Sequence, residues 1–455
     1  MKRILSVLIC FCILLLVLLV GCKVKISIPC IFNKSASENT VSSTTPEDVD
    51  EIVLLKDIRA KKAKWYGNRL LYVTRNGLFK YTPSEGSILI SKDIPEAKLG
   101  WFDFIPSPDN TKYIMLSAEL SENIVEIRDF NGDKLILKLD ISKYCKSAGK
   151  IYHHVEQAGW IDNETIFLST KIRLFLINIK NGNEVQVTQE CTAVLEKAQP
   201  NTEAPYLSWA YNVFKIGDKL YYNSNRELFD PKPKPTSIYS GDWSAESELI
   251  KNAELMIAVD DNRFVYRSET EQGDLRTFLY NIQTGQASLI TDEYILDLKI
   301  LRTNDGKLAF MSGNITGNKF KGVIFDPVTL EKQEFDIDKY NIELDPTDHS
   351  KVFDKDKNQF GRFIGAVERN GEYVFLYIID SYCINPERGY TNKILSYSTM
   401  SKKGINIKTC EDMDEVFMSI SPSGEYVAVE KYRKLTDDEF LLDVVKLNDI
   451  ISYAD

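Results

Sequence analysis

Histidine, the side chain most often used as a metal ligand and as a general base, is rare in this 455-residue chain. Only three histidines occur, and two of them, His153 and His154, are adjacent. Adjacent strand residues point to opposite faces, so this pair would not chelate one metal. The Gly-x-Ser-x-Gly elbow of serine hydrolases is absent from the sequence. We therefore predict no metal, no cofactor and no catalytic residue, and a binding protein in preference to an enzyme.

One short acidic run has the start of a calcium-loop pattern. Asp354, Asp356 and Asn358 alternate with lysines. Gln359 stands where an EF-hand needs glycine, and Gly365 where it needs glutamate. The run is interpreted as a charged loop in water. Carboxylates are nevertheless plentiful, so an enzyme with a carboxylate-based site stays open as the alternative.

Four cysteines beyond the N-terminal region are candidates for disulfides. Cys145 and Cys191 lead into consecutive repeat junctions, and Cys383 and Cys410 belong to one repeat. Outside the cytoplasm they could pair as Cys145–Cys191 and Cys383–Cys410. Four cysteines allow three connectivities, and buried free thiols are the other interpretation.

The N-terminus has the pattern of an export signal. Lys2 and Arg3 precede an apolar run from Ile4 to Val20. The run is slightly long for a signal peptide and slightly short for a membrane-spanning helix, so cleavage and an uncleaved anchor both remain open. Either alternative places the rest of the chain outside the cytoplasm.

The four residues Leu19-Val20-Gly21-Cys22 resemble the lipobox of bacterial lipoproteins. The resemblance implies cleavage before Cys22 and acylation of its thiol. It predicts a signal peptide at 1–21 and a lipid-anchored tether at 22–50, on the extracytoplasmic face of the cell membrane. Residues 33–50 are rich in Ser, Thr, Asn and Glu, and a coil of that length reaches about 25 Å.

Residues 51–455 contain a repeat of short alternating apolar runs joined by tight turns. Each repeat predicts four antiparallel strands, and repeats of about 40–50 residues are typical of a β-propeller. The first turn of each repeat uses residues that tolerate positive φ. These turns are Gly67-Asn68, Asp109-Asn110, Asp162-Asn163, Gly217-Asp218, Asp261-Asn262, Asp305-Gly306, Asn370-Gly371 and Ser423-Gly424.

Two of these turns carry a family likeness. Ser107-Pro108-Asp109 and Ser421-Pro422-Ser423-Gly424 resemble the Ser-Pro-Asp-Gly turn of TolB-like and WD-repeat-like propellers. The Gly-His and Trp-Asp pairs of true WD repeats are absent. The resemblance implies the all-β propeller fold and says little about activity.

The ring is expected to close through the N-terminal segment. Glu51–Asp57 has the pattern of a fourth strand and precedes the first repeat, while the last repeat ends with only three strands at Phe440–Leu447. Pairing of the two segments would complete the last blade. We predict eight blades, with seven as the alternative because the fourth repeat is irregular around Arg226–Gly241.

Antiparallel order places all the long loops on one face of such a ring. Long loops on a rigid scaffold usually carry binding residues, whereas the short turns of the opposite face offer little area. Exposed aromatic and arginine side chains often anchor interfaces. The candidate partner-binding residues are His153, Trp209, Tyr211, Arg388 and Tyr390.

Charge narrows the class of partner. The net charge of -10 and the lack of a basic block disfavour nucleic acid. We expect a lipid-anchored, non-enzymatic propeller that binds an envelope protein or a cell-wall polymer. The alternative is an extracytoplasmic propeller enzyme such as a glycan lyase or hydrolase.

Overall fold

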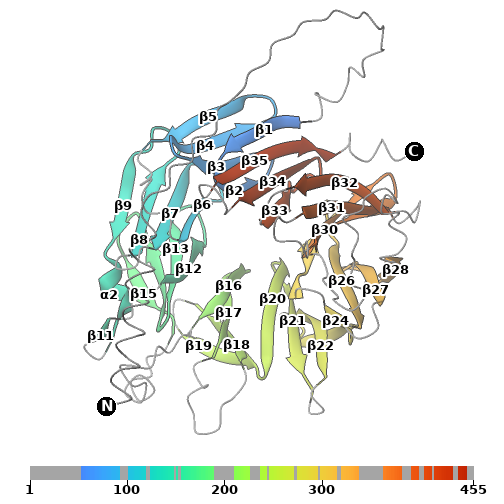
Figure 1. Cartoon of the computed structure of the whole chain (residues 1–455). Helices are drawn as coiled ribbons and strands as arrows, with labels where there is room; N and C mark the ends of the chain where they lie inside the picture. Colours follow the sequence, from blue (N-terminus) through green and yellow to red (C-terminus); the bar gives the residue numbers. More distant parts are fainter. Residues whose placement is uncertain are drawn as a thin grey trace, which may run out of the picture. The chain divides into compact units, whose positions relative to one another are not determined.

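The computed structural model describes residues 53–92, 101–118, 123–147, 150–151, 155–188, 210–225, 236–242, 245–270, 274–295, 298–314, 319–337, 362–381, 391–398, 404–411, 415–433 and 439–447. These residues form an all-β structure, as the repeats predicted. Successive four-stranded antiparallel sheets follow one another along the chain and appear as the blades of Figure 1. We number the blades in chain order.

The first four blades are regular, with each strand paired to the next in sequence. Blade 1 comprises β2 (Lys61–Tyr66), β3 (Arg69–Thr74), β4 (Gly77–Thr82) and β5 (Gly86–Ser91). Blade 2 comprises β6 (Trp101–Pro106), β7 (Lys112–Ala118), β8 (Asn123–Asp129) and β9 (Leu135–Leu139). Blade 3 comprises β12 (Val155–Trp160), β13 (Thr165–Thr170), β14 (Leu174–Asn178) and β15 (Glu184–Gln186). Blade 4 comprises β16 (Tyr211–Ile216), β17 (Lys219–Ser224), β18 (Ser237–Gly241) and β19 (Glu246–Ile250).

The later blades include one irregular sheet and the closing sheet. Blade 5 comprises β20 (Ala253–Asp260), β21 (Arg263–Glu269), β22 (Leu275–Asn281) and β23 (Gln286–Thr291). Blade 6 comprises β24 (Tyr294–Ile295), β25 (Leu301–Arg302), β26 (Leu308–Asn314), β27 (Lys319–Phe325) and β28 (Lys332–Ile337). Blade 7 comprises β29 (Arg362–Arg369), β30 (Glu372–Ser381), β31 (Thr391–Ser398) and β32 (Gly404–Glu411). Blade 8 comprises β33 (Glu415–Ile420), β34 (Tyr426–Arg433), β35 (Glu439–Lys446) and β1 (Val53–Arg59).

Among the described residues the sixth repeat forms an irregular sheet, whereas residues 226–235 of the fourth repeat lie outside the described part. Both β24 and β25 pair with β26, so two short strands share the inner position of blade 6. Between them the exposed Leu298 has a φ of 53°, whereas Ile300 is buried in the core. The described residues thus form seven regular four-stranded blades, the number given above as the alternative, plus one sheet with a divided inner strand.

The connection between blades 2 and 3 was expected to be one of the long loops, but it contains short regular elements. A short helix, α2 (Ile141–Cys145), follows β9 directly. A two-residue hairpin, β10 (Lys146–Ser147) with β11 (Lys150–Ile151), comes next. Ile141, Tyr144 and Cys145 pack into the core between the two blades.

The Ser-Pro-Asp turn is a structural device. The Ser107 hydroxyl donates to Asp109 at 2.6 Å and accepts from the Lys112 backbone N–H at 3.0 Å. In the last blade the Ser421 hydroxyl accepts from the Tyr426 backbone N–H at 3.0 Å in the same way. The side chain satisfies backbone groups that the turn leaves unpaired, so the motif specifies fold and not chemistry.

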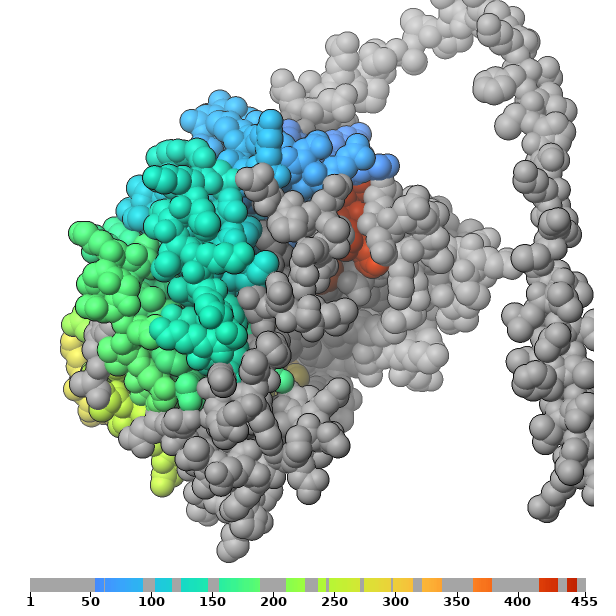
Figure 2. Space-filling model, turned by 90° about the vertical axis from the view of Figure 1, so that its left-hand side faces the viewer, coloured from blue at the N-terminus to red at the C-terminus, as the bar shows by residue number. Residues whose placement is uncertain are grey.

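Neighbouring blades pack through apolar clusters and also through hydrogen bonds that cross each boundary. Figure 2 shows the first blades side by side along one flank, in chain order from blue through green. At every boundary at least one bond joins a side chain of one blade to the backbone of the adjacent blade. One such bond for each boundary is Tyr66 to Phe104, Trp160 to Ile105, Gln157 to Val213, Asn223 to Leu255, Arg302 to Ala258, Lys299 to Phe363, Arg369 to Gly424 and Trp65 to Ser419.

The predicted closure is confirmed. Strand β1 pairs antiparallel with β35, with Val53 opposite Val445 and Arg59 opposite Leu441. The two strands lie side by side in Figure 1 although they are the first and last strands in the sequence. The ring therefore has no open seam between its first and last blades.

Candidate binding groove between blades 1 and 2

Most of the binding residues predicted from the sequence lie outside the described residues. The predicted lipidation site and tether lie there too, and so does the apolar N-terminal run. Within the described part of the chain, no helix is long and apolar enough to cross a membrane. The residues in question are Cys22, His153, Cys191, Trp209, Cys383, Arg388 and Tyr390.

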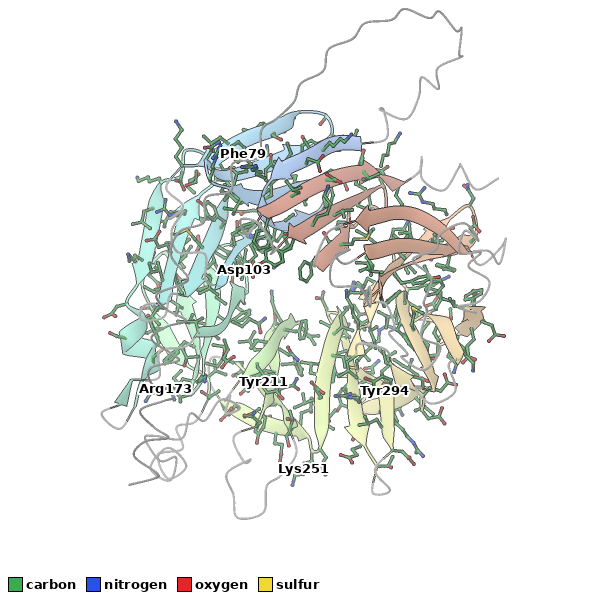
Figure 3. All side chains as sticks on the ribbon, in the orientation of Figure 1. Phe79, Asp103, Arg173, Tyr211, Lys251 and Tyr294 are labelled. Atoms are coloured by element: carbon green, nitrogen blue, oxygen red, sulfur yellow. The ribbon has the colours of Figure 1, made fainter. Side chains whose placement is uncertain are left out.

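Tyr211 is described, and it is not a loop residue. It begins the inner strand β16, as Figure 3 shows. Its hydroxyl lies 3.0 Å from the Thr236 hydroxyl, and burial, the largest cause, raises the pKa of the phenol. The phenol is half-buried and already bonded, and its contact with a partner stays a prediction.

Cys145 is buried in the core between blades 2 and 3, in contact with the cluster around Tyr144 and Val155. Cys410 lies in β32 beside Asn392 of β31, and its side chain is outside the described part. Since Cys191 and Cys383 are outside it too, both disulfides stay predictions.

One cavity that described residues form lies between blades 1 and 2, at the short-turn side of the ring. It is flanked by the β2–β3 turn and by the turns before β7 and β9. Its volume is about 200 Å³. The residues that line it are Tyr66, Arg69, Leu71, Lys80, Ile88, Leu89, Ile90, Pro106, Asn110, Phe130 and Asn131. We call it the blade 1–2 groove.

The floor of the blade 1–2 groove is apolar and fixed. Leu71 is fully buried, and Ile90 and Phe130 pack against the core cluster that contains it. Phe130 lies 4.9 Å from the Tyr113 ring, between centroids. Ile88 and Leu89 continue the apolar surface outward along the edge strand β5, with 42% and 37% of each residue exposed.

The wall of the blade 1–2 groove towards the ring centre is formed by Tyr66, which is hydrogen-bonded to blade 2. Tyr66 donates its hydroxyl proton to the Phe104 carbonyl at 2.5 Å. Burial and the nearby Asp103 carboxylate raise the pKa of this phenol, so it stays neutral. Asp103 itself lies on the inner strand β6 (Figure 3) and faces Lys64 at 3.4 Å. This wall therefore supplies shape and no free acid or base.

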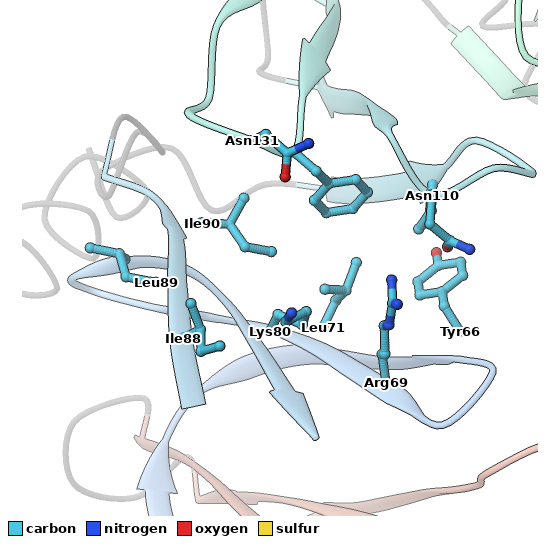
Figure 4. A pocket seen from close by; sticks show the side chains of 11 residues that line it. Tyr66, Arg69, Leu71, Lys80, Ile88, Leu89, Ile90, Asn110 and Asn131 are labelled. Atoms are coloured by element: carbon cyan, nitrogen blue, oxygen red, sulfur yellow. The ribbon is translucent and has the colours of Figure 1, made fainter. Parts of the chain in front are cut away.

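The rim of the groove is cationic and amide-rich. Arg69 is exposed and forms no ion pair or side-chain hydrogen bond with any described residue. Lys80 reaches Glu85 at 3.2 Å, and the hydrogen bond from Lys80 lowers the pKa of that carboxyl. Figure 4 shows Arg69, Leu71 and Ile90 on the blade 1 side, opposite Asn110 and Asn131 of blade 2.

A buried network behind the groove holds the two blades in register. Asp133, in the turn before β9, accepts hydrogen bonds from Tyr113 at 2.6 Å and from Ser91 of blade 1. Arg128 pairs with Asp133 at 3.1 Å and with Glu126 at 2.8 Å. These bonds join the end of β5 to blade 2, so the walls are preorganised.

The groove can recognise an anionic or amide group beside an apolar one. A guanidinium with no ion pair favours a carboxylate or phosphate, and the two carboxamides can donate or accept. At about 200 Å³ the cavity is smaller than the roughly 300–1,000 Å³ of small-molecule sites. It fits one anchoring side chain of a larger partner. Within the described part of the chain, no cluster of three His, Cys, Asp or Glu could hold a metal.

Reasoning from sequence missed this groove because it assigned binding to long loops. Its residues come from two blades that are distant in sequence, such as Tyr66 of blade 1 and Phe130 of blade 2. One signal was available: residues 61–92 contain seven Lys and Arg but only one acidic residue, Glu85.

Comparisons with known proteins agree on the fold. No known family profile matches the chain, and no curated protein matches it in sequence. Dipeptidyl peptidase 4 of Porphyromonas gingivalis is similar in structure, with a TM-score of 0.52 and 11% identity. The match covers 90% of this chain and 61% of that chain.

Two further solved structures are similar over most of their own length. An oligogalacturonate lyase in complex with manganese has a TM-score of 0.44 and 10% identity, over 87% of this chain and 99% of that one. The WD40 domain of SCAP from fission yeast has a TM-score of 0.47 and 10% identity, and the match covers 88% of this chain and 98% of that one. Enzymes and a WD40 domain occur among the similar structures. The sheets of this chain form a β-propeller.

Proposed function

We propose that the chain is a non-enzymatic binding module, a TolB-like propeller lipoprotein that engages an envelope protein or a cell-wall polymer. In this proposal the lipid on Cys22 holds the chain at the extracytoplasmic face of the cell membrane. The apolar run, the lipobox-like residues and the polar tether support this part. Multiple acyl chains would make the attachment stable.

The blade 1–2 groove carries the binding part of the proposal. It combines a rigid apolar floor, an Arg69 guanidinium free of ion pairs among the described residues, and a size that suits one side chain. Interfaces draw most of their energy from a few such pockets that receive an anchor. The exposed Ile88 and Leu89 beside it extend the contact area.

The test is affinity capture from solubilised membranes and cell walls with the full chain in a non-ionic detergent. The groove variant is Arg69→Glu/Ile88→Ser. The control is Arg276→Glu/Leu289→Ser, which changes one exposed cation and one exposed aliphatic residue in blade 5. Both variants must first show native melting. Loss of an anchor pocket typically weakens binding at least tenfold, so we expect the groove variant to lose its partner and the control to keep it.

Two results would count against the proposal. Capture of the same partner by wild type and groove variant would remove the groove from the interface. Turnover of a captured glycan by the purified chain would favour the enzyme. Membrane attachment is tested separately with Cys22→Ala, which should release the chain into the soluble fraction after cell breakage. Equal retention of both forms would indicate a transmembrane anchor.

A further inference from the structure

Blade 1 differs in charge from the rest of the chain. Residues 61–92 contain seven Lys and Arg and one Glu, a net charge of +6 in a chain of net charge -10. The remaining residues therefore carry -16 together. Such a local reversal of sign attracts anions to one blade while the other blades repel them.

The register of blade 1 places several of these cations along one edge. Lys61 lies opposite Val73, Thr74 opposite Gly77, and Leu78 opposite Ser91. The start of β2, the β3–β4 turn and the end of β5 therefore share the long-loop edge of the blade. Three exposed cations mark this edge, namely Lys62, Arg75 and Lys92. We call them the blade 1 cationic row.

The row runs across the blade from its inner strand to its outer strand. Neighbouring strands lie about 4.8 Å apart, so the row extends over about 15 Å. Arg75 and Lys92 form no ion pair with any described residue. Lys62 lies near Glu430 of blade 8, whose carboxylate accepts hydrogen bonds from the backbone N–H groups of Lys62 and Ala63. The lone acid of the blade, Glu85, lies at the opposite edge beside Lys80.

We propose that the blade 1 cationic row binds a linear anionic polysaccharide, one with a carboxylate or phosphate on its sugars. The row lies at the opposite edge of blade 1 from the blade 1–2 groove, so this inference goes beyond the proposed function: it adds a second site and names the class of polymer that the site binds. A narrow polymer can lie along one blade and meet charges spaced over about 15 Å. A flat anionic membrane would also meet the rest of the chain, and the net charge of -16 on the residues outside 61–92 would repel it.

The strength of binding should depend on salt in a defined way. Each polymer charge that is neutralised by a protein cation releases counterions. For single-stranded nucleic acid, each such contact adds about -0.7 to the slope of log K against log salt concentration, and we apply that value here. Three contacts predict a slope of about -2, which is an affinity loss of about 15-fold between 50 and 200 mM salt.

The experiment measures binding of the full chain, in non-ionic detergent, to polyglucuronate and to uncharged dextran of equal length. The test variant is Arg75→Glu/Lys92→Glu. The matched control is Lys251→Glu/Arg276→Glu, which makes the same charge change at exposed positions at the same edge around blade 5; Lys251 has a side chain that is 80% exposed. We expect polyglucuronate to bind with the stated salt slope, the test variant to bind at least tenfold more weakly, and the control to match wild type. Dextran should not bind.

Several results would overturn the inference. Equal weakening by test variant and control would show a general charge effect rather than a site on blade 1. Tighter binding to phosphatidylglycerol vesicles or to a single-stranded oligodeoxynucleotide, lost in the test variant, would assign the row to a membrane or a nucleic acid. If polyglucuronate does not bind but capture from the envelope still recovers a partner through the groove, this inference fails and the proposed function stands. Failure of both would reject both.

Discussion

At the scale of single residues, the most demanding electrostatic site is Lys431 in the closing blade. Its ammonium group contacts Asp443 at 2.8 Å and Asp57 at 2.6 Å, and the lysine side chain is 8% exposed. Asp443 is 1% exposed and also accepts the backbone N–H of Asp57 at 2.8 Å. One buried cation therefore joins three strands, β1, β34 and β35.

The pH dependence of this site has a definite sign. Burial, the largest effect, would lower the pKa of Lys431, but hydrogen bonds and charges from Asp443 and Asp57 outweigh it and raise the pKa. A lysine with a raised pKa in the folded state contributes stability that is complete below the unfolded value, about 10.5, and is lost as pH rises through the folded value. The contribution is therefore lost only in strongly alkaline solution.

We predict that Lys431→Met lowers the free energy of unfolding by about 3–5 kcal/mol at pH 7, because Asp443 loses its main partner while buried. The difference between wild type and variant should stay constant up to about pH 10.5 and shrink above it. Urea titrations from pH 7 to 11.5 measure this difference. Buried tyrosines such as Tyr113, whose pKa is raised by burial, also make the protein less stable in alkaline solution. This loss is the same in both proteins, so it cancels in the difference between wild type and variant. A difference that grows with pH would contradict the assignment.

At the scale of elements, Gln and Asn side chains form hydrogen bonds between neighbouring blades at the positions where the inner strands have bulges. The register of β16 shifts between Tyr211 and Phe214, and the Gln157 side chain bonds both backbone groups of Val213 within that bulge. Asn223 does the same for Leu255, at 2.8 Å and 3.3 Å, next to a register shift in β20. A bulge leaves backbone groups unpaired, and these side chains satisfy them.

We predict that Asn223→Leu lowers the free energy of unfolding by about 2–4 kcal/mol, because it leaves a buried backbone N–H and C=O of Leu255 without partners. The matched control is Asn304→Leu. Asn304 makes the same pair of bonds to the Glu368 backbone, at 2.7 Å and 3.1 Å, but at an exposed site. Water can replace the carboxamide there, so the control should cost about 1 kcal/mol or less. Chemical denaturation of both variants gives the comparison, and equal losses would refute the role of burial.

At the scale of the whole molecule, stability depends on the pairing of the two ends of the ring. Strand β1 supplies the outer strand of blade 8, and its Leu54, Leu55 and Ile58 pack against the core shared with blade 1. Trp65 of blade 1 adds a hydrogen bond to the Ser419 carbonyl at 3.1 Å. The N-terminal segment is therefore part of the propeller and not an appendage to it.

Deletion of residues 51–57 should lower the melting temperature markedly. The deletion removes the Asp57 carboxylate that pairs with Lys431 and breaks the β1–β35 ladder. It also removes the apolar contacts of Leu54 and Leu55, whose burial contributes about 2 kcal/mol or more to the free energy of unfolding. Deletion of residues 35–45, in the predicted tether, should leave the melting temperature within about 1 °C. Differential scanning calorimetry of both deletions provides the measurement. Equal melting temperatures would show that ring closure does not stabilise the fold.

The sequence by itself determined what depends on neighbours along the chain. Alternating apolar residues and turn pairs such as Gly67-Asn68 and Asn370-Gly371 predicted the strands, because period-2 alternation and positive φ are local properties. The last repeat lacked a strand and Glu51–Asp57 offered one, so closure could be predicted as well. The divided inner strand of the sixth repeat was not predicted, because the division depends on how blade 6 packs and not on a local sequence pattern.

Tertiary structure alone decided which side chains meet. Tyr66, Asn110 and Phe130 form one groove, and Lys431 joins Asp57 across 374 positions, because blade packing brings distant turns and strands together. A side chain's role then depends on its surroundings. Tyr211, expected on an exposed loop, is half-buried and bonded, while Arg69, unremarked in the sequence, is exposed at the groove rim. Burial and partner geometry arise only when the ring is assembled, so they could not be read from residue order.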